Sequence, residues 1–187
     1  DFVSAVGNID SMFYTGEDTH HSASQLNEMV QVLSERFKTV KSSRERVGIL
    51  NTFLFREMGF QYEKSLDNIK FALLPSVIRS RRGNCIGLSL LYLYLGRKLN
   101  LPICGVSVPN HTFVRLRDDD LMLNFELSDS GNSHTYQEYV ERFGIVSDMK
   151  ESIYMRDLSD REVVGLLYSN VGVIALKQGK FVEAIKV

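Results

Sequence analysis

The sequence predicts an α+β fold in which helices come first and a small antiparallel sheet follows one central apolar helix. Two observations lead to this class. Apolar residues recur at helical spacing over much of the first 80 residues, and a strongly apolar helix is expected over Cys85 to Leu99. Beyond residue 102 the pattern changes to short segments rich in branched and aromatic residues, which are typical of strands.

The N-terminal part, residues 1–80, is expected to be mainly helical. A weakly amphipathic stretch within residues 1–16 predicts a short helix, and the polar run GEDTHHSAS predicts a loop after it. A longer helix is expected to begin at Ser24, where an apolar stripe starts. The stripe consists of Leu26, Met29, Val30, Leu33 and Phe37.

Two further helices complete this part of the chain. Ser42 or Ser43 is a suitable cap for the first of them, because a serine side chain accepts a hydrogen bond from the first turn. Gly59 is expected to end that helix. After an irregular segment, a helix over about residues 72–80 is expected to begin near Pro75 or to bend there, because proline is tolerated in a first turn but breaks or kinks a helix interior.

The sheet is predicted from ICGVSV, HTFVRLR and LMLNFEL, with turns at Pro109-Asn110 and at three consecutive aspartates. At least two of these strands form a hairpin. A closing helix is expected around Thr135 to Phe143, ended by Gly144. Residues 1–150 are therefore predicted to form one domain, with the cysteine-bearing helix and sheet in 81–130 and the closing helix in 131–150.

The last segment, residues 155–187, has a different pattern. It fits a tetratricopeptide unit, in which small residues stand where two antiparallel helices cross and aromatic residues fill the gaps. The matching positions are Tyr168, Val171, Gly172, Ala175, Gly179, Phe181, Ala184 and Ile185. Because a single repeat cannot bury its apolar face, this truncated helical hairpin is expected to pack on the preceding domain or on another chain, and further repeats are expected in the parent protein.

Composition excludes several function classes. The net charge of -1 gives no basic excess for nucleic acid, and no apolar run approaches the roughly 20 residues of a membrane span. Two cysteines, Cys85 and Cys104, lack the spacing of a zinc motif or a disulfide framework. We therefore expect no metal, no cofactor and a cytoplasmic location. Because the chain begins at Asp1, an exported form with a removed leader is the alternative.

Three residues form a candidate catalytic set. Cys85 follows Asn84, a good capping residue, and so is expected at a helix start, where the helix dipole stabilises a thiolate. His111 opens a strand and is the candidate base. Glu126, on the next strand, is the candidate acid that would orient the imidazole.

Strand alternation supports this set but leaves alternatives open. Asn124 shares a strand face with Glu126, and Asp129 lies just beyond the strand, so either residue is an alternative to Glu126. Taken alone, Cys85 is more simply a buried packing residue, since cysteine is among the most buried residue types. A metal bound by Cys85 and His111 would need further ligands that the sequence does not offer.

The sequence resembles the SirB-like branch of the transglutaminase-like superfamily over roughly Glu45 to Ile145. The similarity is carried by a Leu-Phe…Gly-Phe segment, an Arg-Arg-Gly turn, a Leu-Ser helix and the segment Pro-Asn-His-Thr-Phe-Val-Arg, which resembles the family's Pro-Gly-His-Phe-x-x-Arg. The corresponding residues are Leu54-Phe55, Gly59-Phe60, Arg81-Arg82-Gly83, Leu88-Ser89, Pro109-Asn110-His111, Phe113 and Arg115. Trailing tetratricopeptide repeats are a pairing that such proteins often show.

The resemblance implies a papain-like fold with a cysteine helix on an antiparallel sheet. It also implies cysteine-dependent acyl transfer, as in a protease, deamidase or transamidase, with Cys85 as nucleophile and His111 as base. Glu126 stands where the superfamily usually has aspartate. Many members of this branch lack the cysteine, so a non-catalytic scaffold for protein or peptide partners is the second implied function.

Overall fold

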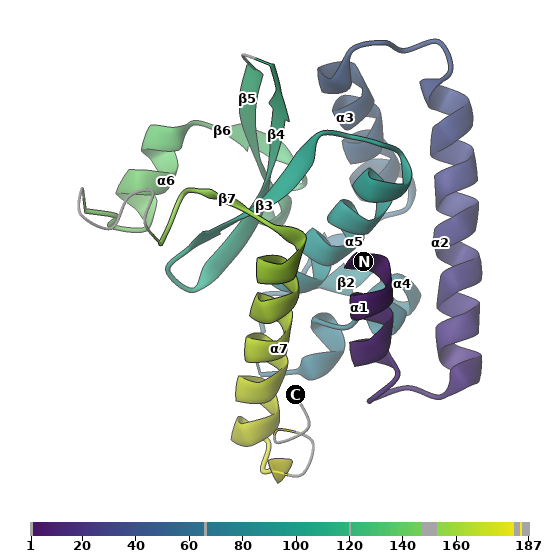
Figure 1. Ribbon diagram of the computed structural model, residues 1–187, viewed down its shortest axis with the longest axis vertical. Helices are drawn as coiled ribbons and strands as arrows, with labels where there is room; N and C mark the ends of the chain where they lie inside the picture. Colours follow the sequence, from purple (N-terminus) through teal and green to yellow (C-terminus); the bar gives the residue numbers. More distant parts are fainter. Residues whose placement is uncertain (1, 66, 120, 147–152, 182–183, 185–187) are drawn as a thin grey trace.

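An antiparallel sheet and one apolar helix form the centre of the molecule (Figure 1). The computed structural model describes residues 2–65, 67–119, 121–146, 153–181 and 184. Helices α1 to α4 cover the central helix α5 on the side away from the sheet, and α6 lies on the opposite side of the sheet (Figure 1). This mixed helix and sheet architecture agrees with the predicted class.

The sheet has five strands in the order β6-β5-β4-β3-β7, and every neighbouring pair is antiparallel. Its strands are β3 Ile103–Val108, β4 His111–Asp118, β5 Leu121–Glu126, β6 Asn132–His134 and β7 Asp157–Leu158. β3 to β5 are the three predicted strands. β6 and β7 are additional, and each is too short for its alternation to be recognised in the sequence. A two-residue turn at Pro109-Asn110 joins β3 to β4, so that Val108 pairs with His111.

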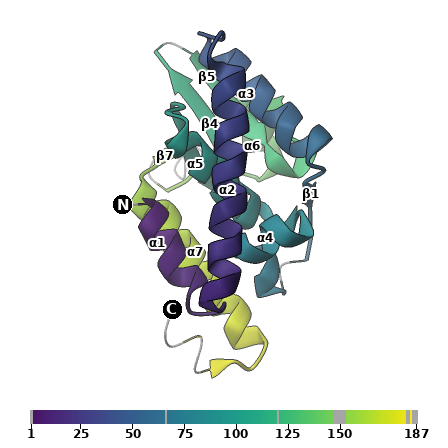
Figure 2. The same ribbon diagram turned by 90° about the vertical axis from the view of Figure 1, so that its right-hand side faces the viewer.

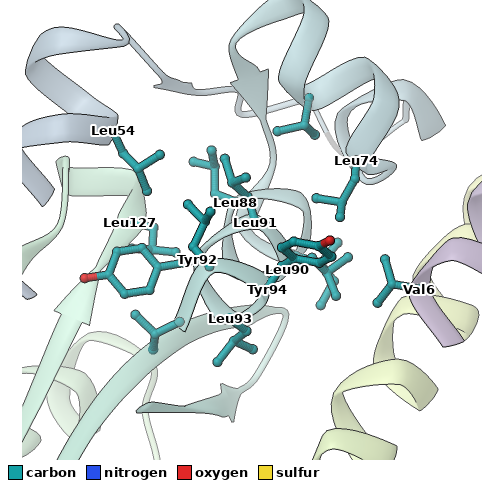
Figure 3. Packing of buried hydrophobic residues seen from close by; sticks show 14 of the residues in the cluster. Val6, Leu54, Leu74, Leu88, Leu90, Leu91, Tyr92, Leu93, Tyr94 and Leu127 are labelled. Atoms are coloured by element: carbon teal, nitrogen blue, oxygen red, sulfur yellow. The ribbon is translucent and has the colours of Figure 1, made fainter. Parts of the chain in front are cut away.

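The central helix α5, Cys85–Lys98, is buried on all sides from Cys85 to Gly96, which explains why its sequence is apolar without a polar face. Its side chains radiate into the main core (Figure 3). There Leu88, Leu90, Leu91, Tyr92, Leu93 and Tyr94 pack in one apolar cluster with Val6, Leu54, Leu74 and Leu127. This packing on several elements fixes α5, and therefore its first residue, relative to the sheet.

Four helices precede α5, namely α1 Phe2–Asp10, α2 Gly16–Phe37, α3 Ser43–Asn51 and α4 Leu74–Ser80. The predicted loop GEDTHHSAS was wrong, because these residues form the first turns of α2 (Figure 2). Thr15 caps the helix by accepting a hydrogen bond from the Asp18 N–H, and Glu17 and Asp18 interact favourably with the helix dipole. The polar residues are the solvated face of a helix.

The segment between α3 and α5 brings a short strand to the start of α5. α3 begins after the Ser42 cap and continues as the π-helical turn η1, Thr52–Glu57, before Gly59 adopts a φ of 71°. β1, Gln61–Tyr62, then pairs in parallel with β2, Arg82–Gly83, with the 3-10 turn η2, Ile69–Phe71, between them. This pairing places Tyr62 opposite Gly83, two residues before Cys85.

The closing helix α6, Tyr136–Arg142, begins with a capping box of Thr135 and Glu138, and Gly144 follows it at a φ of 61°. It packs on the sheet face opposite α5, over a second and smaller apolar cluster. That cluster consists of Val106, Val108, Phe113, Tyr139, Val140, Ile145 and Met155. The predicted closing segment 131–150 therefore contains β6 and α6, and residues 147–150 lie outside the described residues.

Helix α7, Asp160–Lys177, lies beside α1 (Figure 2) and contacts β3. A Cβ atom at Gly105 of β3 would be 2.9 Å from Val163, so the close contact of α7 with the sheet requires glycine there. Residues 157–158 form β7, so the helix begins at Asp160, later than the predicted start of the hairpin at 155. The second helix of the predicted tetratricopeptide unit falls mostly on residues outside the described ranges, and the repeat stays a prediction.

Candidate functional site

Cys85 is the first residue of α5, and its position is fixed by the capping residue Asn84. The Asn84 side-chain oxygen accepts a hydrogen bond of 3.0 Å from the Gly87 N–H, and Asn84 itself is fully buried. A Cβ atom at Gly87 would be only 2.1 Å from the carbonyl oxygen of Phe71, so this turn fits closely against η2. The Cys85 side chain is therefore held at the positive end of the helix dipole.

His111 begins β4 directly after the hairpin turn. Its Nε2 atom lies 2.8 Å from Oε2 of Glu126, and its ring stacks on Phe143 with centroids 5.2 Å apart. The side chain is 8% exposed. The imidazole is thus held by one hydrogen bond at its edge and by an aromatic ring on its face.

Glu126, the last residue of β5, is fully buried, and both of its carboxylate oxygens are hydrogen-bonded. Oε2 accepts from Tyr139 Oη at 3.1 Å in addition to its bond with His111. Oε1 accepts from the backbone N–H of Ser128 at 2.9 Å and from the Ser128 hydroxyl at 2.6 Å. A buried carboxylate is tolerated here because every strong acceptor direction has a donor.

The protonation states follow from these contacts. Burial opposes a charge on His111, but hydrogen bonds to Cys85 and Glu126 and their negative charges outweigh it and raise the pKa of His111 to about 9. Burial likewise opposes the charge of Glu126, and the bonds to His111 and Ser128 outweigh it and lower the pKa of that carboxyl. At neutral pH the pair is therefore an imidazolium beside a carboxylate.

Cys85 and Glu126 both act on the His111 imidazole and raise its pKa. Glu126 is hydrogen-bonded to Nε2, which leaves Nδ1 as the nitrogen available to the thiol. An imidazole in this position can exchange a proton with the thiol while the carboxylate fixes its orientation and tautomer. The structure thus brings together Cys85, His111 and Glu126.

A cleft of about 300 Å³ opens beside Cys85 and His111. The end of the β3–β4 hairpin forms one wall of this cleft and α7 forms another. The lining residues are Cys85, Ser107, Val108, Asn110, His111, Thr112, Leu166, Ser169, Asn170, Val173, Ile174 and Lys177. The residues from α7 recur every three or four positions and so lie on one face of that helix.

Each of the three supporting candidates has a hydrogen-bond partner other than His111. Asn84 caps α5 as predicted. Asn124, an alternative to Glu126, accepts a hydrogen bond of 2.7 Å from Nε of Arg115, and Asp129 lies 2.9 Å from Nε2 of His134. These two alternatives to Glu126 were wrong, because each is engaged elsewhere and Glu126 is the carboxylate on His111.

Sequence reasoning missed the groups that hold the His111–Glu126 pair. Tyr139 lies on α6 and Phe143 directly follows it, and only the packing of that helix on the sheet brings them to the pair. Ser128 could have been found, because a serine two residues after a carboxylate often bonds it in a tight turn. Tyr62 is also close to the site: burial raises its pKa, and the negative charges of Cys85 and Glu126 add to the rise.

A metal centre finds no support in this arrangement. Within the described part of the chain, no three His, Cys, Asp or Glu side chains are grouped in a way that could hold an ion. Both cysteines are free. Across the same residues, no helix combines the length and the apolar character needed to cross a bilayer.

The fold and the site together define a class: an α+β protein in which a cysteine at the start of a buried helix faces a histidine and a carboxylate on an antiparallel sheet. A family model described as the transglutaminase-like superfamily matches residues 20–167. The chain therefore belongs to the transglutaminase-like superfamily.

Curated relatives are similar at low identity. A UPF0162 protein of Pseudomonas aeruginosa is 24% identical over 168 residues, covering 89% of this chain and 62% of the relative. A UPF0162 protein of Xylella fastidiosa is 30% identical over 99 residues, which are 52% of this chain and 35% of the relative. Protein SirB1 of Salmonella typhimurium is 22% identical over 142 residues, covering 74% of this chain and 52% of SirB1. The match to each therefore spans less than two thirds of the relative. No solved structure matches.

Proposed function

We propose that this protein catalyses cysteine-dependent acyl transfer, with Cys85 as nucleophile, His111 as acid and base, and Glu126 as the residue that orients His111. The observation that carries the proposal is the alignment of thiol, imidazole and buried carboxylate beside a 300 Å³ cleft. Each group alone has a structural explanation, but a thiol and a buried carboxylate that both interact with one imidazole beside a cavity form the arrangement that nucleophilic catalysis requires.

The first half of the reaction forms an acyl-enzyme. The Cys85 thiolate attacks a carbonyl carbon of the substrate, and the carbonyl π electrons move to oxygen, which the backbone N–H of Cys85 at the helix start stabilises. The tetrahedral intermediate then collapses. The bond to the leaving nitrogen breaks, and the proton on Nδ1 of His111 is transferred to that nitrogen, so that an amine or ammonia departs and a thioester remains.

The second half returns the enzyme to its starting state. Neutral His111 removes a proton from water or from an amine acceptor, which attacks the thioester carbon. Collapse of the second intermediate breaks the carbon–sulfur bond and restores the thiolate beside the imidazolium. Glu126 remains a carboxylate throughout and stabilises the imidazolium. Water as acceptor gives hydrolysis or deamidation, and an amine gives transamidation.

We propose a protein or peptide as the substrate and the cytoplasm as the compartment. The cleft has hydroxyl, amide and aliphatic groups along its walls, which suits a peptide backbone and uncharged side chains. Two free cysteines suit a reducing compartment, where a thiol nucleophile stays reduced.

The test compares the alkylation rates of the two cysteines by iodoacetamide at pH 7, read by peptide mass spectrometry. Burial and the nearby Asp157 raise the pKa of Cys104 to about 12, so Cys104 is an internal reference for an inert thiol. We expect Cys85 to react on the order of 100-fold faster than Cys104 in the folded protein. The His111→Gln substitution should remove most of that difference.

Circular dichroism of each variant controls for unfolding. Equal rates at Cys85 and Cys104 in the folded wild-type protein would contradict the proposal. Cys85→Ala removes the fast-reacting site and serves as the blank for any later assay of hydrolysis or amine incorporation.

The second candidate is a non-catalytic interaction module. It is favoured by three apolar side chains at the C-terminal end of α7 and just beyond it, Val173, Leu176 and Phe181, which are 50%, 52% and 63% exposed. A tetratricopeptide unit in this segment would use such residues for packing or binding. A Cys85 that is no more reactive than Cys104 favours this candidate over catalysis.

A further inference from the structure

A second cavity, of about 430 Å³, adjoins the cleft that contains Cys85. Ser107, Val108, Asn110 and Leu166 line both of them. These shared residues come from the end of the β3–β4 hairpin and from the middle of α7. The two cavities are therefore two halves of one groove, which runs between α7 and the hairpin.

The groove is long relative to a small metabolite. Its α7 wall extends from Glu162 to Lys177, which is about 22 Å at the rise of an α-helix. A polypeptide in extended conformation covers roughly 3.3 Å per residue, so the groove accommodates about six residues. A free amino acid would fill only a small fraction of it.

The half that lacks Cys85 is the more apolar one. Ile153, Tyr154, Leu158 and Leu166 contribute aliphatic or aromatic surface, and Ile153 is 58% exposed. The two charged residues there, Arg156 and Glu162, form an ion pair with each other. Their charges are thus largely compensated, and an uncharged side chain can be buried in this half of the groove.

We infer that this second cavity is a binding subsite for an extended polypeptide substrate, and that it holds an apolar side chain several residues away from the acyl group at Cys85. The inference rests on the proposed function and specifies its substrate: an internal segment of a peptide or protein, recognised on both sides of the hairpin tip. Continuity of the subsite with the cleft is the observation that identifies the occupant.

The experiment measures alkylation of Cys85 by short peptides that carry an iodoacetyl group at the N-terminus or, in a second series, an iodoacetamide group at the C-terminus. Each peptide consists of glycines with a single leucine, and the leucine is moved stepwise away from the reactive group. For leucine three to five residues away, we expect a second-order rate constant at least ~10-fold above that of the all-glycine peptide of equal length, since removal of a leucine side chain from water strengthens binding by roughly that factor or more.

Matched variants assign the effect to the subsite. Ile153→Asp changes an exposed residue that lines only the second cavity, and Val146→Asp changes a residue of similar exposure, 59%, that lines neither cavity. Ile153→Asp should abolish the leucine acceleration while the rate with plain iodoacetamide stays unchanged. Val146→Asp should leave both rates unchanged.

The inference is overturned when no leucine position accelerates labelling, or when Ile153→Asp keeps the acceleration. The readout is the ratio of the rate constants with which two peptides alkylate the same thiol. This ratio can be measured even when Cys85 reacts slowly. A slow iodoacetamide rate at Cys85 therefore counts against the proposed function, and an absent leucine effect counts against the subsite, as two separate results.

Discussion

The two ends of the β3–β4 ladder contain the same kinds of groups in a different order. At the hairpin end, where Val108 pairs with His111, Cys85 faces His111 and Glu126 lies behind it. At the other end, Cys104 of β3 lies opposite Arg115 of β4. Each end thus has a cysteine, a buried cationic side chain and a carboxylate.

At the Cys104 end the carboxylate lies beside the thiol. Nη1 of Arg115 donates to Asp157 at 2.7 Å and to the Met155 carbonyl at 3.0 Å, and Asp157 is a further cause, after burial, of the raised pKa of Cys104. A negative charge next to a thiol opposes its ionisation. This end is a structural ion pair that ties β4 to β7.

At the hairpin end the cation lies between the thiol and the carboxylate. A thiolate on Cys85 therefore faces positive charge from His111 and from the start of α5, while Glu126 is separated from it by the imidazole. Buried charge alone does not set the hairpin end apart as the candidate site, because both ends have it. The order of the groups and the access to a cavity do.

The largest expected effect comes from removing the carboxylate at each end. Asp157→Asn leaves the buried Arg115 cation without its negative partner, and Glu126→Gln removes the carboxylate that keeps the buried His111 protonated. Each should lower the free energy of unfolding by about 3 kcal/mol. Only Glu126→Gln should also slow alkylation of Cys85, by roughly 10-fold or more, since it removes the group that stabilises the imidazolium.

Urea unfolding followed by circular dichroism gives the stabilities, and mass spectrometry gives the alkylation rates in the folded proteins. If Asp157→Asn slowed Cys85 alkylation as much as Glu126→Gln does, the two ends of the strand pair would be one coupled network. That result would contradict the distinction between them.

Much of the hairpin end was predictable from the sequence, and the other end was not. Asn84 followed by Cys85 indicated a helix start, and strand alternation placed Glu126 on the polar face of β5. Asp157, in contrast, belongs to a two-residue strand that no periodicity reveals, and Arg115 could be assigned its carboxylate partner only once β7 was known. The location of α7 along the cleft was likewise not predictable, because its sequence pattern indicates an apolar helix but not what it covers.

The next effect concerns the pH dependence of stability. The pKa of His111 is raised from 6.5 to about 9 in the folded state, so its contribution to stability is complete below pH 6.5 and is lost as the pH rises through 9. Over that window the wild-type protein should lose on the order of 1–3 kcal/mol of unfolding free energy.

The His111→Gln variant should lose clearly less unfolding free energy than the wild-type protein over the same pH interval. Asp157→Asn should keep the wild-type slope of stability against pH, because it leaves the His111–Glu126 pair unchanged. Urea unfolding at four or five pH values measures each slope. Identical slopes for wild type and His111→Gln would contradict an imidazolium at the hairpin end.

The smallest expected effect separates support of the His111–Glu126 pair from ordinary packing. Tyr139→Phe removes the hydroxyl that donates to Glu126, and Tyr92→Phe removes one that donates to Asn51 at 2.8 Å, away from the site. Each loses one hydrogen bond, so each should cost about 1–2 kcal/mol of unfolding free energy. Tyr139→Phe alone should also lower the pKa of His111 measured by NMR, because a carboxylate with one donor fewer is less firmly held against the imidazole. An unchanged His111 pKa in Tyr139→Phe would show that Ser128 and the strand geometry are sufficient to hold Glu126, and that Tyr139 belongs to the packing of α6.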